Sequence, residues 1–313
     1  MKPAQWIFLT LALSCLHPIV PSAAALLTGM AFALIFGNPF ANETKVWTPK
    51  LLQFSVMGMG AAMDLSVVGK VGVQGIGYTI IGIVATLALG FFLGKALKIG
   101  RDTVLLVSSG TAICGGSAIA AIAAVTGARA AEVSVALVVV FLLNALALFI
   151  FPPIGHALSM SQPDFGMWSA LAIHDTSSVV GAGLQYGTEA LQIATTVKLA
   201  RALWIIPLAL AVGLSRSKGT AALAKVKKPW FILGFLLAAA LVTFVPSLQP
   251  AGQWVAVVAR RFLVVTLFLI GSGLTRDALK EVGLRPFLLG FLLWICVASA
   301  TLGALRIGWI VPV

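Results

Sequence analysis

Long apolar stretches recur along the whole chain, and they constrain its fold more than any other feature of the sequence. A helix of about 17 to 25 apolar residues crosses a hydrocarbon core that is about 30 Å thick. The stretches are continuous and lack the alternation that is typical of a membrane β-barrel, so only helices satisfy the backbone in lipid. We predict an all-α membrane protein of about eleven transmembrane helices, near residues 6–20, 22–38, 50–68, 71–94, 103–126, 131–153, 165–184, 190–213, 229–246, 254–275 and 286–305.

The composition agrees with an integral membrane protein. Hydrophobic residues make up 60% of the chain, charged residues only 10%, and the mean hydropathy is +1.07. The net charge of +12 would suggest a nucleic-acid partner in a soluble protein. Here the positions of the lysines and arginines instead follow the membrane topology. If the N-terminus is cytoplasmic, 14 of the 21 lysines and arginines lie in inside segments, and only Lys70, Arg129 and Arg306 lie outside. This bias predicts a cytoplasmic N-terminus, a C-terminus on the opposite side and no nucleic-acid partner.

The segments between the spans are too short to fold as soluble domains. The longest polar connection covers only residues 215–229. We therefore expect a single membrane domain over residues 1–313, with halves 1–153 and 165–313 as its internal division. The first span, which follows Lys2, also has the features of a signal peptide, but no soluble domain comes after it.

One short motif occurs twice and indicates an internal repeat. The pattern G-x-G-x-x-x-D joins Gly58 to Asp64 and Gly271 to Asp277, at the ends of spans that run in opposite directions in the predicted topology. Repeats of opposite orientation are common in secondary transporters. The pattern therefore favours an inverted repeat.

The span at residues 103–126 carries a polar interruption, SSGTAICGGS, at residues 108–117. Glycine, serine and threonine in mid-helix weaken it, so we expect an unwound stretch near residues 110–117 and a new half-helix starting near Ser117. The start of such a half-helix presents free N–H groups and a positive dipole end, which suit an anion. Close helix packing by small residues is the alternative. The candidate binding residues are Ser109, Gly110, Thr111, Cys114, Gly115, Gly116 and Ser117.

The span at residues 165–184 has a second interruption at its centre. His174 and Asp175 lie there, followed by Thr176, Ser177 and Ser178. Placing an ionisable group at this depth in the membrane costs at least about 2.5 kcal/mol, so we first consider such a group as a functional residue. We expect Asp175 or Thr176 to cap a second half-helix, His174 and Asp175 to exchange a proton, and the three hydroxyl residues to bind the substrate. The alternatives are a loop position and a purely structural His-Asp pair.

Two further cations lie inside the span at residues 190–213. Lys198 and Arg201 are three residues apart and share one helix face. We expect them to attract an anionic substrate or to neutralise Asp175, with snorkelling to the membrane surface as the alternative. Asn144 in the span at residues 131–153 is a lesser polar candidate, typical of an interhelical hydrogen bond.

The sequence shows no pattern of catalytic or metal-binding residues. The three cysteines lie inside apolar runs, which predicts neither a disulfide framework nor a metal site. The G-x-G patterns follow no strand, so a dinucleotide site is excluded. We expect no enzymatic activity, no cofactor and no metal.

The two interruptions, GTAICGGSAIAA and HDTSSVVGAG, resemble the bacterial family of YeiH-like conserved membrane proteins, which is named for sulfate export. The resemblance covers nearly all of the chain, although the second motif is richer in hydroxyl residues. It implies a fold similar to the sodium/proton antiporter and bile-acid symporter group, with a panel domain and a core domain whose broken helices cross. It also implies a location in the bacterial inner membrane, with a periplasmic C-terminus, and a homodimer.

These observations lead to one functional hypothesis and two alternatives. We expect a secondary transporter, an exporter of a small anion such as sulfate or a sulfonate, that works by alternating access and is coupled to protons. A sodium or other cation/proton antiporter would use Asp175 and the carbonyls of the same breaks. A non-transport membrane scaffold would need the breaks only to pack its helices.

Overall fold

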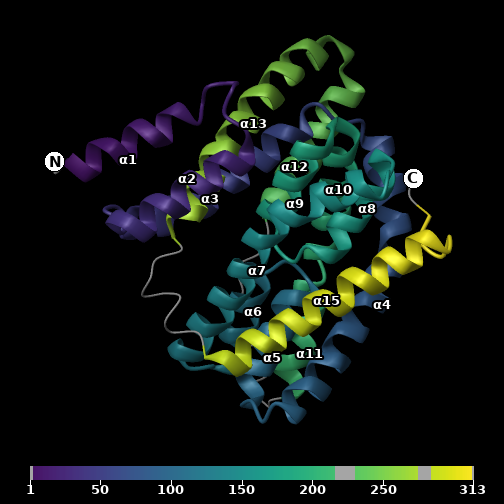
Figure 1. Cartoon of the computed structure of the whole chain (residues 1–313). Helices are drawn as coiled ribbons and strands as arrows, with labels where there is room; N and C mark the ends of the chain where they lie inside the picture. Colours follow the sequence, from purple (N-terminus) through teal and green to yellow (C-terminus); the bar gives the residue numbers. More distant parts are fainter. Residues whose placement is uncertain (1–2, 216–229, 274–282, 312–313) are drawn as a thin grey trace. The chain divides into compact units, whose positions relative to one another are not determined.

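The computed structural model describes residues 3–215, 230–273 and 283–311, and every regular element in these segments is helical (Figure 1). The α-helices are α1 (Pro3–Ser14), α2 (Ser22–Phe36), α3 (Ala41–Gly60), α4 (Leu65–Ala96), α5 (Arg101–Ala112), α6 (Gly116–Thr126), α7 (Ala130–Ala157), α8 (Gln162–Ala172), α9 (Thr176–Tyr186), α10 (Thr188–Ala202), α11 (Ile205–Ser215), α12 (Trp230–Phe244), α13 (Gln249–Ser272) and α15 (Leu284–Arg306). A short 3-10 turn, η2 (Pro246–Leu248), precedes α13.

The helices confirm the prediction of an all-α, multi-pass membrane protein. Most predicted spans coincide with one helix or with two consecutive short ones, but the span predicted at residues 50–68 is misplaced, because α3 ends at Gly60 and α4 begins at Leu65. Within the described residues, five stretches are long and apolar enough to cross a membrane: Gly77–Ala96, Ala131–Ala157, Thr188–Ser215, Pro246–Ser272 and Leu284–Arg306. The predicted span at residues 190–213 is divided at Leu203 and Trp204 into α10 and α11, a division that its hydropathy did not indicate.

The helices form two compact units. Unit 1 contains Met1–Gly69 and Trp230–Leu279, and unit 2 contains Lys70–Pro229 and Lys280–Val313. This division differs from the halves 1–153 and 165–313, because each unit takes segments from both halves.

In unit 1, α13 packs against α2 and α3, and α12 packs against α3. Glycines allow these backbones to approach: a Cβ at Gly271 of α13 would collide with the carbonyl oxygen of Leu26 in α2, and a Cβ at Gly29 would collide with that of Phe268. Small residues at helix contacts are the usual way in which membrane helices pack closely. Gly271 of the repeated motif is thus a packing residue, while its partner position 277 lies outside the described residues.

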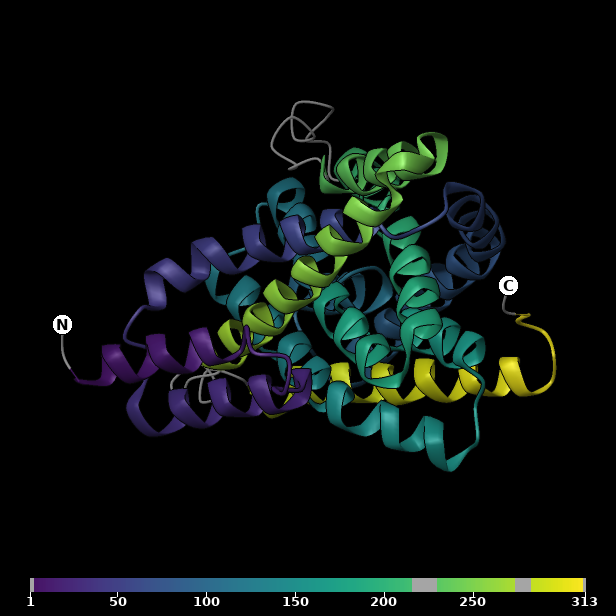
Figure 2. The same cartoon turned by 90° about the horizontal axis from the view of Figure 1, so that it is seen from above.

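In unit 2, α10 packs against α8 and α9, α7 packs against α5 and α9, and α15 packs against α5, α7 and α8. The long α15, yellow in Figures 1 and 2, runs without interruption from Leu284 to Arg306. All four half-helices that flank the two sequence interruptions belong to this unit.

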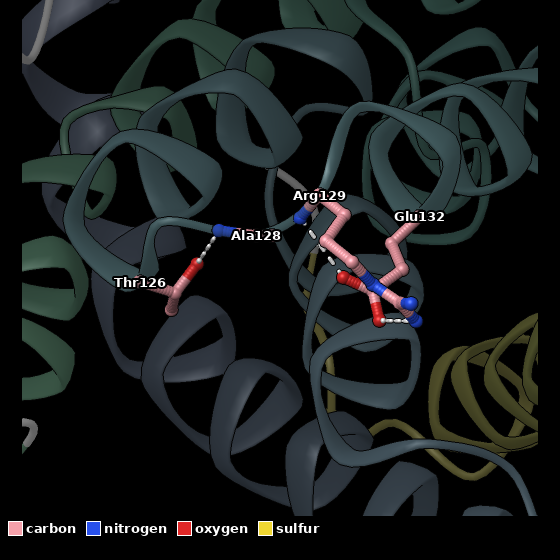
Figure 3. A network of polar contacts seen from close by, with 4 residues as sticks. All are labelled: Thr126, Ala128, Arg129 and Glu132. Carbon is pink, nitrogen blue, oxygen red and sulfur yellow. Dashed lines mark hydrogen bonds and ion pairs between the residues drawn. The ribbon is translucent and has the colours of Figure 1, made fainter.

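A polar turn joins α6 to α7 (Figure 3). Thr126 accepts a hydrogen bond at its hydroxyl from the backbone of Ala128 (3.3 Å). The backbone N–H and the guanidinium of Arg129 each donate to the Glu132 carboxylate at 2.9 Å. This turn fixes the start of α7, which carries Asn144 toward the interruptions.

Two helix breaks and their supports

The first interruption is a break of three residues between α5 and α6. Helix α5 continues to Ala112 and α6 begins at Gly116, so the unwound stretch is narrower than the predicted residues 110–117. Gly115 turns the chain with a φ of +69°, which side chains rarely tolerate, and its N–H donates to the carbonyl of Gly110 (2.9 Å). The half-helix predicted near Ser117 therefore exists and starts one residue earlier.

The start of α6 has no side-chain cap. Its N-cap residue is Gly115, which has no side chain to offer. The first N–H groups of an α-helix have no acceptor within the helix, so this end presents the positive end of the helix dipole and N–H donors, of which that of Ala118 interacts with the Cys114 thiol. Gly116 is half-buried and Ser117 is exposed, so this start remains accessible.

The second interruption is a break between α8, which ends at Ala172, and α9, which begins at Thr176. Asp175 caps α9, as predicted: its carboxylate accepts from the backbone N–H of Ser178 (3.2 Å) and from the Ser177 hydroxyl. This half-helix start is therefore already occupied by an internal carboxylate, in contrast to the start of α6.

Asn144 of α7 holds the second break in place. Its side-chain oxygen accepts from the backbone N–H groups of His174 (2.9 Å) and Asp175 (3.2 Å). These donors lack helical partners because the chain is unwound there, and leaving one buried without an acceptor costs about 1–3 kcal/mol. Asn144 is 1% exposed and is more important than the sequence indicated, where it stood as a lesser candidate. The feature of the sequence that pointed to this role is a polar amide deep inside an apolar span.

The two breaks meet. A Cβ at Gly115 would lie 3.3 Å from both the Cα and the Cβ of Asp175 and 3.4 Å from its Oδ1. The turn of the first break and the cap of the second are thus in van der Waals contact. Segments separated by about 60 residues of sequence come together at one point within unit 2.

Arg201 and Lys198 of α10 bind the carbonyl ends of both upstream half-helices. The Arg201 guanidinium donates from Nε to the carbonyl of Ala112 (2.6 Å) and from Nη1 to that of Leu171 (2.7 Å). Nζ of Lys198 donates to the carbonyls of Ile173 (2.7 Å) and Ala170 (3.4 Å). Both side chains are buried, at 1% and 0% exposed, so snorkelling to the membrane surface is wrong. Their positive charges lie at the negative ends of the α5 and α8 dipoles.

The remaining predicted residues surround these contacts. Ser109, Gly110 and Thr111 are buried in the last turns of α5, and Cys114 is buried in the first break. Thr176, Ser177 and Ser178 are buried in the first turn of α9. Several buried polar atoms have no hydrogen-bond partner among the described residues: the hydroxyls of Ser108, Ser109, Thr111, Thr195 and Thr196, Nδ2 of Asn144 and both ring nitrogens of His174. Buried polar groups normally have partners, so these atoms are candidates for a further polar contact at the breaks.

Fold and site define the class: a multi-pass α-helical membrane protein with two contacting helix breaks whose carbonyl ends are bound by buried cations. The described residues hold no group of three or more His, Cys, Asp or Glu that could bind a metal. Residues 7–290 match the family described as conserved hypothetical protein 698. The chain belongs to this family, in agreement with the resemblance seen in the two break motifs.

Relatives match over almost their whole length. A UPF0324 membrane protein of Bdellovibrio bacteriovorus is 60% identical over 99% of this chain and 96% of its own length. A UPF0324 membrane protein of Geobacter sulfurreducens is 48% identical over 96% of both chains. One of Bacteroides thetaiotaomicron is 49% identical over 90% of this chain and 86% of its own. No solved structure matches the chain.

Proposed function

We propose that this protein is a secondary transporter of a small anion, such as sulfate or a sulfonate, that works by alternating access. The contact between Gly115 and Asp175 carries the proposal, because it brings the uncapped start of α6 to the centre of a polar site. A half-helix start at mid-membrane is a recurrent anion site in transporters. Unit 2 would be the core that carries the substrate, since both breaks lie in it.

The distribution of charge favours an anion over a cation. A cation would need the carbonyl oxygens at the ends of α5 and α8, but Arg201 and Lys198 already occupy four of these. At the start of α6 the N-cap residue Gly115 offers no side chain, and the Ala118 N–H has only a weak acceptor, the Cys114 thiol, as its internal partner. The protein thus supplies its own cations to the negative helix ends and leaves the positive end of α6 without a carboxylate cap like that of α9.

The proposal includes proton coupling through His174 and Asp175. Both are buried at the second break, at 0% and 9% exposed. An ionisable pair at this depth is costly without a function. The protein would lie in the bacterial inner membrane with its N-terminus in the cytoplasm, and would act as an exporter.

The test is a combination of ligand binding and flux. Purified protein would be screened by thermal shift against sulfate, thiosulfate, taurine and sodium, and flux of the stabilising solute would be measured in proteoliposomes. We expect an anion to stabilise the protein, and Asp175→Asn to uncouple its flux from the proton gradient. Asp164→Asn is the matched control, since Asp164 lies in the first turn of α8, away from both breaks. Proton-coupled flux that is unchanged in Asp175→Asn would remove this aspartate from the mechanism.

A cation/proton antiporter is the second candidate, and the Asp175 carboxylate is the observation that favours it. Sodium-dependent stabilisation and sodium flux without any anion would establish it in place of the anion transporter. Absence of stabilisation by every anion and cation would instead favour the scaffold function.

A further inference from the structure

Asp175 places a carboxyl group at the point where the two breaks meet. Every hydrogen bond that its side chain accepts from the described residues goes to Oδ2, from the Ser177 hydroxyl, the Ser178 N–H and, at 3.4 Å, the Ser178 hydroxyl. The other oxygen, Oδ1, lies toward Gly115, where a Cβ would be 3.4 Å away. An anion bound at the start of α6 would therefore have this oxygen as a neighbour.

We infer that the protein binds a doubly charged anion together with one proton, and that the proton is carried on Asp175. The inference rests on the proposed function, because it concerns the same anion site. An ionised carboxylate next to a bound anion is a like-charge pair, which disfavours the charged form of both. A protonated carboxyl removes the repulsion and offers an O–H donor to the anion, while its other oxygen still caps α9.

The charge balance of the site agrees with this stoichiometry. Each helix start carries about half a positive charge and each helix end about half a negative charge. The ends of α5 and α8 and the starts of α6 and α9 therefore cancel, and Lys198, Arg201 and Asp175 remain. With Lys198 and Arg201 both protonated, the sum is about one positive charge with Asp175 ionised and about two with Asp175 protonated. Only the protonated site balances a dianion such as sulfate.

The charged and titratable groups around Asp175 make its carboxyl the site of the bound proton. On α10, Lys198 interacts with it electrostatically, and at the first break Cys114 does so. Helix α7 presents the neutral amide of Asn144, and the only carboxylate of α8, Asp164, lies in its first turn at the other end. His174 follows Ile173, whose carbonyl binds Lys198, so an imidazolium would be a third buried cation there.

The sign of the pH dependence tests the inference. Sulfate affinity of the purified, full-length protein would be measured between about pH 5 and about pH 8, where sulfate keeps its double charge. If the complex holds one proton more than the free protein, the Kd rises with pH, by up to about tenfold for each pH unit. Asp175→Asn should bind sulfate with a Kd that does not change with pH, whereas Asp164→Asn should keep the slope of the wild type.

The outcomes separate the inference from the proposed function. A wild-type slope that is lost in Asp175→Asn supports both. Sulfate binding that is independent of pH in the wild type, or a slope that persists in Asp175→Asn, overturns the inference and leaves the anion site in place. Failure to bind sulfate, thiosulfate or taurine at any pH overturns both, as does sodium binding that weakens on acidification. If Asp175→Asn does not fold, His174→Gln takes its place: a slope that is retained in His174→Gln supports the inference, and a slope that is lost assigns the proton to the imidazole and overturns it.

Discussion

The guanidinium of Arg201 in α10 donates a hydrogen bond of 2.6 Å to the carbonyl of Ala112, the last residue of α5. A second bond of 2.7 Å joins the same guanidinium to Leu171 near the end of α8. One side chain thus ties together the ends of the two half-helices that precede the breaks. A planar guanidinium suits this task, since its donors point in fixed and separate directions.

Replacing Arg201 should therefore destabilise the protein as well as stop transport. Arg201→Met leaves two buried carbonyls without a donor, and we expect a loss of about 3 kcal/mol in the free energy of unfolding. Arg201→Lys should recover only part of it, because a lysine does not reproduce the fork. Unfolding of the purified variants in detergent measures both. Arg260→Met is the control, since among the described residues Arg260 bonds only to Ala256 of its own helix, at 3.4 Å, and the change should alter stability by less than about 1 kcal/mol. If Arg201→Met is as stable as the wild type, the two Arg201 hydrogen bonds do not hold the ends of α5 and α8 together.

Asn144 should behave as a structural support of the second break. Asn144→Leu removes the acceptor of two backbone N–H groups, those of His174 and Asp175, and we expect a loss of about 2 kcal/mol. The measurement is again unfolding in detergent, together with flux in proteoliposomes. Gln185→Leu is a matched amide control, because the Gln185 bonds are long, at 3.3 and 3.4 Å, and their loss should matter less. The support role is wrong if both variants lose the same stability.

A carboxylate introduced at the start of α6 should occupy the place of the anionic substrate. Ser117→Asp places a negative charge in the first turn of this uncapped helix, where it gains about 0.5–1 kcal/mol from the helix dipole. We expect a slightly more stable protein whose sulfate affinity falls at least about tenfold, because like charges compete for one place. Calorimetry or a thermal-shift titration gives the affinity. Ser161→Asp, at the cap of α8, serves as control and should keep the wild-type affinity. Undiminished sulfate binding by Ser117→Asp would place the anion elsewhere.

The packing of unit 1 should depend on the glycine of the repeated motif. Gly271→Ala brings a Cβ against the backbone of Leu26, so α2 and α13 must separate, at a cost of about 2 kcal/mol or more. Gly303→Ala is the control in another helix, since no atom lies within 4 Å of its added Cβ. Thermal unfolding of the two variants compares them directly. A stable Gly271→Ala would show that this helix contact adjusts without strain.

The sequence by itself determined the membrane class, the position of most spans and the position of both breaks. These properties are local, since a run of apolar residues specifies a membrane helix wherever it lies, and glycines and hydroxyl residues weaken a helix at their own positions. Asp175 as the cap of α9 was predictable for the same reason, because a cap bonds to residues two and three positions ahead. The width of the first break was overestimated, since Gly110 and Thr111 remain helical when neighbouring helices bury them.

Only the tertiary structure decided which groups meet at the breaks. Arg201 is 89 residues from the carbonyl of Ala112, and Asn144 is 30 residues from the N–H of His174. From the sequence, Lys198 and Arg201 are expected to attract an anionic substrate or to neutralise Asp175, whereas in the folded chain they bind the carbonyl ends of α5 and α8. Pairings of this kind depend on which helix faces pack together, and no local pattern of residues encodes that choice.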